Sequence, residues 1–333
     1  MRKWYNVSGE QGDIVLSSRI RLARNLKEYP FPNRLNRQQM LEVNTKIREV
    51  TEKSGQKFMY LEMEQLPKEH AISLAERHLI SPDFAENPEG RVLLITEDEE
   101  IALMLCEEDH IRLQVMGSGL CLEEAYKKAD KLDNYLNSNL NYAFDSRLGY
   151  LTQCPTNLGT GMRASVMLHL PALSSCGQLS RLANTISKLG LTIRGVFGEG
   201  SNSMGDIYQL SNQVSLGISE EVAIKNLTSI TLQIIAQERA AAGEMIKNPE
   251  VQDKIFRAYG VLKNARLLST DEFMSLMSIV RLGAVNNILD INIEKISELI
   301  VNMQAATLSV MKGESLPPEK RDMFRAEIVR ETI

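Results

Sequence analysis

Two arginines, Arg19 and Arg21, alternate within the segment SSRIRLAR at residues 17–24. Alternate side chains of an extended strand point to one face, so both guanidinium groups would face the same ligand. Guanidinium groups bind oxyanions through paired hydrogen bonds, which makes two of them on one face a clamp for phosphate. A pair of surface salt bridges is the alternative that this segment leaves open.

Three consecutive acids, Glu107, Glu108 and Asp109, end an apolar run in the segment LCEEDHIRLQ at residues 105–114. Crowded carboxylates repel one another unless they serve a site or face water. Arg112 follows within an apolar alternation, and an arginine in that setting favours a specific anionic partner. The segment therefore predicts either acids at a reactive site or a solvated turn.

Two glycine-rich segments follow, QCPTNLGTGMRASV at 153–166 and IRGVFGEGSNSMGD at 193–206. Small residues let the backbone approach a ligand closely, and its N–H groups can then bind phosphate. Cys154 would be a reactive thiolate if cations surround it, although a buried structural thiol is the simpler alternative. The second segment predicts a loop that closes over a ligand, or else an ordinary surface loop.

Familiar nucleotide-binding motifs are missing from the sequence. It contains neither a Walker A motif nor the HRD and DFG signatures of ordinary protein kinases. A nucleotide site would therefore have to be built from scattered arginines.

The elements that position these segments mix strands and helices over the first two-thirds of the chain and are helical from about residue 219. Apolar runs between polar turns predict strands, and apolar residues at helical spacing predict helices. The predicted strands are 17–24, 92–96, 100–106, 110–116 and 150–154, the second and third forming a hairpin. The predicted helices are 37–53, 66–79, 122–138, 165–173 (with a strand as the close alternative), 219–247, 270–287, 291–312 and 317–331.

A domain boundary is expected near residue 255. It would separate an α/β catalytic domain at residues 1–255 from a helical C-terminal domain at residues 256–333. Such a small helical domain buries too little apolar surface alone, so we expect it to mediate dimerisation.

Composition and charge exclude several classes of function. The 333 residues carry a formal net charge of −5, which does not indicate a broad nucleic-acid surface. The N-terminal segment lacks the apolar core of a signal peptide, and the apolar stretches are shorter than the ~18 residues of a membrane span. The four cysteines form no CxxC pair and indicate a reducing compartment. We expect a cytoplasmic protein that binds neither membrane nor nucleic acid.

Together the motifs resemble the catalytic domain of the phosphagen kinases, the creatine and arginine kinase superfamily. The resemblance covers roughly residues 13–250 and rests on SSRIR, EEDHIR, CPTNLGT, RASV and RGVFGE in this order. It implies an α/β (α+β) fold in which helices flank a largely antiparallel sheet, followed here by an all-helical C-terminal domain.

The same resemblance implies roles for individual residues. Glu108 would align the guanidinium of the substrate and accept its proton, with Glu107 beside it and Cys154 next to the guanidinium. Mg²⁺ would be held mainly through the phosphates of ATP, since the sequence shows no dedicated protein ligand set. The residues expected to bind ATP are Ser17, Ser18, Arg19, Ile20, Arg21, His78, Arg112, Arg163, Ala164, Ser165, Val166, Met167, Arg194, Gly195, Val196, Phe197, Gly198 and Glu199.

Two features resemble the bacterial protein-arginine kinases of the McsB type. The small helical domain that usual phosphagen kinases carry before the SxRxR strand is not found, which would open the site to protein-bound arginine. An RDxxRA motif near the C-terminus implies a phosphoarginine pocket linked to allosteric control, although a charged helix surface is the plain alternative. That pocket would comprise Arg321, Asp322, Arg325 and Ala326.

Two positions depart from the family pattern. In the closing loop, Ser201 is followed by Asn202, where arginine kinases have a second glutamate. Asparagine cannot accept a proton, so Glu108 would carry the acid–base role alone. Cys106 stands where the family usually has asparagine.

The resemblance also implies partners: protein substrates with exposed arginine, a zinc-binding activator, a Clp-type unfoldase–protease and a homodimer or larger assembly in the stress response. Two alternatives are a kinase of free arginine or another guanidino metabolite, and a non-catalytic phosphoarginine-binding adaptor. The RDMFRA segment argues against the first, and the intact set of arginines with Glu108 and Cys154 argues against the second.

Overall fold

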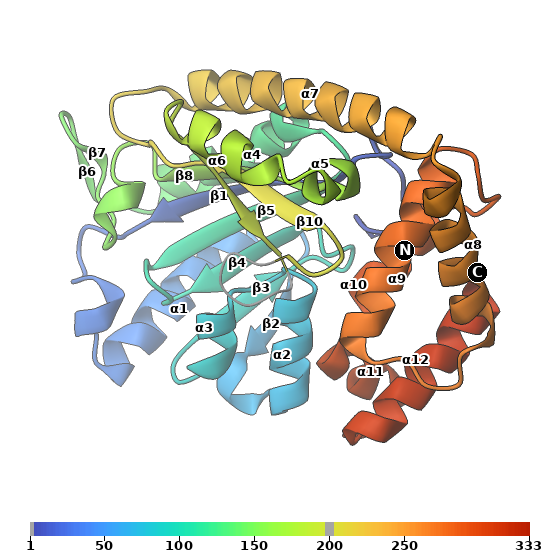
Figure 1. The fold of residues 1–333 in the computed structure, drawn as a ribbon. Coiled ribbons are helices and arrows are strands. Elements are labelled where there is room, and N and C mark those ends of the chain that lie inside the picture. The colour runs from blue at the N-terminus through green and yellow to red at the C-terminus, as the bar shows by residue number, and fades with distance from the viewer. Residues whose placement is uncertain (1–2, 197–202) are drawn as a thin grey trace.

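A single large antiparallel sheet forms the centre of the molecule in the computed structural model, which describes residues 3–196 and 203–333 (Figure 1). Its eight strands follow the order β2-β3-β4-β5-β1-β8-β10-β9, and all neighbouring strands run antiparallel. The predicted fold class is confirmed. The predicted site residues that lie outside the described residues are Phe197, Gly198, Glu199, Ser201 and Asn202.

The strands of the sheet are short except for the central ones, and the predicted hairpin is present as the pair β3–β4. They are β1 (Val15–Arg24), β2 (Met59–Glu62), β3 (Val92–Ile95), β4 (Ile101–Leu105), β5 (Ile111–Ser118), β8 (Met162–His169), β9 (Leu191–Gly195) and β10 (Ile207–Asn212). A separate ladder pairs β6 (Phe144–Asp145) with β7 (Gly149–Tyr150).

Helices cover both faces of the sheet and make up the C-terminal part of the chain. Those among the strands are α1 (Arg37–Glu52), α2 (Lys68–Glu76), α3 (Pro82–Glu86), α4 (Leu122–Asn139), α5 (Pro171–Ser175) and α6 (Leu179–Ser187). Those that follow are α7 (Glu220–Met245), α8 (Pro249–Asn264), α9 (Thr270–Val285), α10 (Ile293–Asn302), α11 (Ala305–Lys312) and α12 (Pro318–Thr332).

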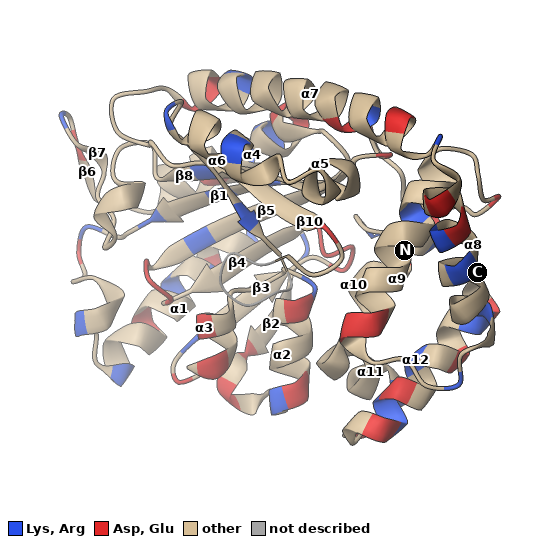
Figure 2. Ribbon diagram, viewed as in Figure 1, with Lys and Arg blue, Asp and Glu red and all other residues tan. Residues whose placement is uncertain are grey.

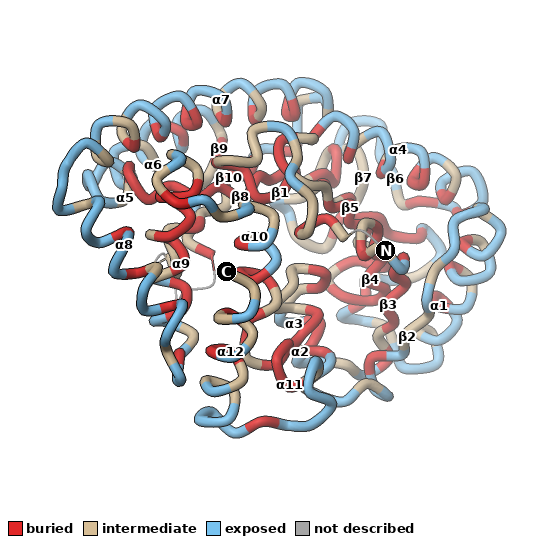
Figure 3. Tube along the Cα trace, turned by 90° about the vertical axis from the view of Figure 1, so that its right-hand side faces the viewer, coloured by how far each residue is buried: buried red, intermediate tan, exposed pale blue. Residues whose placement is uncertain are grey.

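One face of the sheet is packed against α1, α4, α6 and α7. Ile20 and Leu22 of β1 lie in this core together with Ile47 of α1, Leu136 of α4 and Leu227 of α7. Figure 3 shows the buried residues of α7 along the side that faces the sheet. Because side chains alternate along a strand, Arg19 and Arg21 of β1 point to the other face.

The other face carries two smaller apolar clusters at opposite ends. Helices α2 and α3 pack against Leu93 and Met104 at the β3–β4 end. Helices α8 to α12 form a cluster that reaches Met167 and Ile207 on β8 and β10. The strands between these clusters, β5 and β1, carry polar and charged side chains on this face.

Three predictions about elements were wrong or incomplete. Residues 165–173 were expected as a helix, but 162–169 form β8, which lies between β1 and β10. A strand covered on both faces has a continuous apolar run, so periodicity cannot separate it from a buried helix. The helix expected at 291–312 is interrupted, because Gln304 is extended with φ −75° and ψ 158°. Of the strand expected at 150–154, Tyr150 alone is in a strand, β7.

Helix α8 was missed by the sequence patterns, and the boundary expected near residue 255 falls inside it. Asn248 caps this helix through its side chain, and Pro249 occupies the first turn, which are both ordinary start signals. The exact division of the chain into domains stays a prediction.

Candidate functional site

All five arginines expected to bind phosphate lie on the face of the sheet that carries α2 and α3. The register places Arg21 opposite Arg163 on β8 and Arg19 opposite Ser165, so their side chains share this face. Arg112 lies two residues from Gln114, the partner of Arg21 on β5. Arg194 joins the same face from β9 through its pairing with Gln209 of β10. Figure 2 shows the basic segments on these strands.

The arginine cluster is electrostatically unfavourable by itself. Burial lowers the pKa of Arg19 to about 10, and Arg112 and Arg163 add to the shift by repulsion. The pKa of Arg21 lies well below its usual value, first because of burial and then because of repulsion by neighbouring arginines, with Glu107 opposing the shift. Buried like charges are costly unless an anion compensates them, so the face is suited to a polyanion.

Unused donors on this face point to the same kind of ligand. Among the described residues, Nε of Arg21 and Nε of Arg163 are buried and have no hydrogen-bond partner. Arg19 is oriented by Nε donating to Ser165 Oγ at 3.3 Å and by Nη2 donating to Gln209 Oε1 at 2.6 Å. Buried donors without acceptors are rare, and phosphate oxygens would satisfy them.

The turn between β4 and β5 presents the two glutamates. Asn25 holds the turn from inside, since its Nδ2 donates to Asp109 Oδ1 at 2.5 Å and its Oδ1 accepts from the His110 N–H at 2.9 Å. Cys106 begins the turn with a left-handed φ of 58°. Asparagine tolerates this conformation better than cysteine, which accounts for the family's usual residue at this position.

Glu107 and Glu108 differ in their partners. The carboxylate of Glu107 is buried, forms an ion pair with Arg112 and accepts a hydrogen bond from the hydroxyl of Ser81. Glu108 is half-buried, and Asn157 Nδ2 approaches its Oε2 at 3.5 Å. Glu107 therefore positions Arg112, and Glu108 is the carboxylate available to a substrate.

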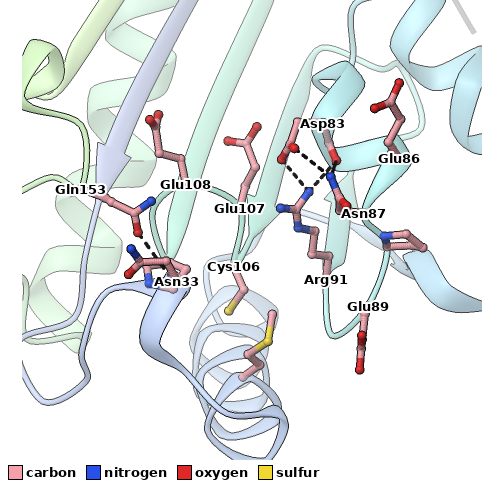
Figure 4. Close-up of a pocket in the computed structure, with 13 residues that line it drawn as sticks. Asn33, Asp83, Glu86, Asn87, Glu89, Arg91, Cys106, Glu107, Glu108 and Gln153 are labelled. Atoms are coloured by element: carbon pink, nitrogen blue, oxygen red, sulfur yellow. Dashed lines mark hydrogen bonds and ion pairs between the residues drawn. The ribbon is translucent and has the colours of Figure 1, made fainter.

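Both glutamates line a cavity of about 580 Å³ (Figure 4). Figure 4 shows their side chains projecting side by side from the turn, with Gln153 on one side and residues of α3 on the other. A second cavity of about 230 Å³ is lined by Arg163, Arg194 and Asn157.

Cys154 belongs to the same constellation. Its Sγ lies 3.0 Å from Thr156 Oγ1 in the loop before β8. Burial lowers the pKa of Arg163, and repulsion by Arg194 and Arg112 lowers it further. Cys154 and Glu108 oppose this shift. The structure thus brings the thiol, the carboxylate and the cation together.

His78 follows α2 in a left-handed conformation with φ 60°. The helix ends with the Leu79 N–H donating to Leu74 O at 3.0 Å, a termination in which glycine usually occupies the left-handed position. Burial lowers the pKa of His78 to about 3, and Arg19 adds to the shift. The imidazole is therefore neutral, so it adds no charge to the arginine face.

Some expected residues lie away from this face. Ile20, Ala164 and Val166 are in the core on the opposite side of the sheet, and Ser18 Oγ donates to Gly119 O at 2.8 Å. Met167 and Val196 pack with the C-terminal helices. Conversely, Ser81, Gln209 and Asn157 hold site residues and were not predicted, since a lone polar residue gives no signal of its partner.

The expected phosphoarginine pocket has an unexpected internal arrangement. Arg325 is buried, with Nε donating to Met303 O at 2.9 Å and Nη2 donating to Thr270 Oγ1 at 2.9 Å. Its Nη1 lies 2.7 Å from Asp322 Oδ1, and Ala326 is in the core. Arg325 therefore faces inward while Arg321 is half-buried, and the pocket stays a prediction.

Two searches of residues 3–196 and 203–333 were negative. No helix in these ranges has both the length and the apolar character needed to cross a membrane. The same ranges hold no group of three or more His, Cys, Asp or Glu residues that could bind a metal ion.

Two family models match the chain. Residues 41–241 match the C-terminal catalytic domain of ATP:guanido phosphotransferases. Residues 248–333 match the C-terminal domain of the protein-arginine kinase McsB.

Similar proteins cover nearly the whole chain. A protein-arginine kinase of Caldanaerobacter subterraneus subsp. tengcongensis is 45% identical over 95% of this chain and 96% of its own length. A protein-arginine kinase of Clostridium acetobutylicum is 42% identical over 100% of both chains.

Solved structures with a similar fold are phosphagen kinases. The duplicated taurocyamine kinase of Schistosoma mansoni has a TM-score of 0.62 and 31% identity, over 69% of this chain and 33% of that one. Lombricine kinase has a TM-score of 0.61 and 25% identity, over 70% of this chain and 68% of that one.

Proposed function

The chain belongs to the ATP:guanido phosphotransferase family, and from this premise we propose that it phosphorylates the guanidinium of arginine residues in other proteins, with ATP as donor. Relatives that match over nearly the full length are protein-arginine kinases. The observation that carries the proposal is the face of arginines, which has buried and unused Nε donors, beside the accessible carboxylate of Glu108.

The arrangement supports a direct transfer. A guanidinium with a pKa above about 12 is not nucleophilic until it loses a proton, and Glu108 is placed to accept that proton. The guanidine nitrogen then forms a bond to the γ-phosphorus as the bond to the ADP oxygen breaks. Arg19, Arg21, Arg112, Arg163 and Arg194 neutralise the charge on the phosphates, which is the main task in phosphoryl transfer.

Other groups at the site support this role. Mg²⁺, held through phosphate oxygens, would supply further charge neutralisation. Cys154, next to Arg163, would lie beside the guanidinium of the substrate, and neutral His78 would contact the nucleotide. Glu107 keeps Arg112 in place through their ion pair.

Assembly and regulation extend the proposal. Large apolar side chains are exposed on the C-terminal helices, among them Phe256 of α8, Met311 of α11 and Met323 of α12. If two copies associate through this part of the chain, these side chains would be buried between them. A phosphoarginine pocket around Arg321 and Asp322, a zinc-binding activator, a Clp-type unfoldase–protease and action in the cytoplasm complete the proposal by family resemblance.

One assay separates the acceptor classes. The protein is incubated with ATP–Mg²⁺ and either free arginine or an unfolded protein such as casein, and acid-labile phosphate is measured. We expect label on the protein. Label on free arginine alone would replace the proposal by a metabolite kinase, and absence of label on both would refute kinase activity.

A further inference from the structure

Helix α3 stands between two cavities that share part of their lining. The first is the cavity of about 580 Å³ that holds Glu107 and Glu108. The second, of about 630 Å³, lies between α2 and α3. Glu86 and Pro88 line both cavities, so the two adjoin at the C-terminal end of α3, and we refer to them together as the groove.

The two ends of this groove differ in chemistry. The part between α2 and α3 is lined mainly by apolar side chains, and all of these except Ile72 also pack on the β3–β4 end of the sheet. These side chains are Met63, Leu66, Ala71, Ile72, Ala75 and Ala85. A polypeptide segment with apolar side chains would bury them here.

The part near the catalytic glutamates is acidic. It is lined by Asp83, Glu86 and Glu89 in addition to Glu107 and Glu108, against the single cation Arg91. Arg91 is already used, because its Nη1 lies 2.9 Å from Asp83 Oδ2 and donates to Asp83 O at 2.7 Å.

Glu86 is exposed at the junction of the two parts. No ion pair of Glu86 occurs among the described residues. A cationic segment would therefore be attracted toward this end of the groove, with the free carboxylate of Glu86 as its first partner.

We infer that this groove docks a stretch of unfolded substrate polypeptide, with apolar side chains between α2 and α3 and a basic side chain at Glu86. This inference rests on the proposed function. It commits to an unfolded substrate because apolar side chains are mostly buried in folded proteins. The cavity of Glu108 is one part of this groove, so a docked segment would place its arginine beside the carboxylate.

The charge of the groove is tested with a pair of peptides that contain one acceptor arginine each. One peptide carries lysine and leucine residues beside the arginine, and the other carries glycine and serine. We expect kcat/KM to favour the first by about tenfold, and the preference to fall by about threefold or more in Glu86→Lys, with Glu86→Gln in between. The exposed Glu244→Lys of α7 has the same change in net charge and should keep the preference.

The apolar part of the groove is tested in the same way. A third peptide keeps the lysines and replaces the leucines by serine. Ile72→Ser should reduce the advantage of leucine over serine without changing the advantage of lysine. The matched control is Leu41→Ser on α1, which is 48% exposed and far along the chain from α2.

The outcomes separate the inference from the proposed function. Equal kcat/KM values for the peptides with the native protein would overturn the docking groove and leave the kinase activity standing. Equal losses on all peptides in Glu86→Lys would also overturn it, since Glu86 would then act on the reaction. If the native protein phosphorylates no peptide and no unfolded protein, the proposed function fails and the groove falls with it.

Discussion

At the scale of single residues, the arginine face is stabilised when it binds phosphate. Arg21 is repelled by Arg19, Arg112 and Arg163, and its pKa is lowered well below the usual value mainly because it is buried. Without nucleotide, the charge of Arg21 therefore reduces the stability of the folded protein, and the same charge becomes favourable once phosphate is bound. Folding stability and ATP affinity should respond to this residue in opposite directions.

We expect Arg21→Met to raise the free energy of unfolding without nucleotide by about 1 kcal/mol, because a partly buried, repelled charge is replaced by an apolar side chain of similar length. ATP affinity should fall by about tenfold to a hundredfold through the loss of charged hydrogen bonds. Urea unfolding and calorimetry measure the two effects. Arg147→Met, at an exposed turn, is the control; a destabilised Arg21→Met protein would contradict the account.

The sequence predicted this face well and the acids less well. Alternation in SSRIR places Arg19 and Arg21 on one side, and this is confirmed. The different environments of Glu107 and Glu108 depend on Ser81, Arg112 and Asn157, which approach from other elements. The spacing of residues along the chain does not predict contacts of this kind.

At the scale of elements, α2 links the C-terminal helices to the site. Glu76 in its last turn accepts hydrogen bonds from the N–H groups of Ala306 and Thr307 at 2.9 and 2.8 Å, which caps α11. Two residues later, the chain reaches His78. The cap also accounts for the helix break at 303–304, because α11 starts where a carboxylate from α2 meets it. A periodic pattern through 291–312 could not reveal this tertiary cap.

Glu76→Gln should lower the free energy of unfolding by about 1–2 kcal/mol, because a carboxylate at a helix N-terminus is replaced by a neutral group that accepts fewer hydrogen bonds. Urea unfolding at neutral pH tests this. Glu69→Gln, on the same helix and bonded to Ser315 at 3.0 Å, should change stability much less. Equal effects of the two substitutions would show that the cap is unimportant.

At the scale of the whole molecule, buried histidines make stability depend on pH. Burial lowers the pKa of His78 to about 3, that of His110 to about 4, and that of His169 well below its usual value. The unfolded chain takes up these protons below pH ~6.5 and the folded chain does not, so stability is lost as the pH falls. Glu238 has the opposite sign, because burial raises its pKa to about 6.

Three histidines outweigh one glutamate, so the free energy of unfolding should fall by roughly 2–3 kcal/mol between pH 6 and pH 5. Urea unfolding at a series of pH values measures this slope. Glu238→Gln should make the fall steeper, because the opposing proton is removed. A flat profile over this range would be inconsistent with neutral buried histidines.

At this scale, too, some features could be predicted from the sequence and others could not. The fold class and the antiparallel sheet were implied by the family resemblance that the motifs carry, and they are confirmed. Whether Arg325 faces solvent or the interior was not accessible, because α12 has charged residues around much of its circumference and its packing against Met303 and Thr270 decides the matter. The groove along α3 likewise combines Glu107 and Glu108 with residues of α2 and α3, which belong to none of the catalytic motifs.

The central claim is that Glu108 takes the proton of an arginine while the arginine face holds ATP. The most direct test is single-turnover phosphorylation of an unfolded protein by Glu108→Gln, with nucleotide affinity measured on the same sample. We predict a loss of about 10²-fold or more in the rate of transfer, with ATP affinity nearly unchanged. Transfer at close to the native rate would contradict the assignment of the proton acceptor.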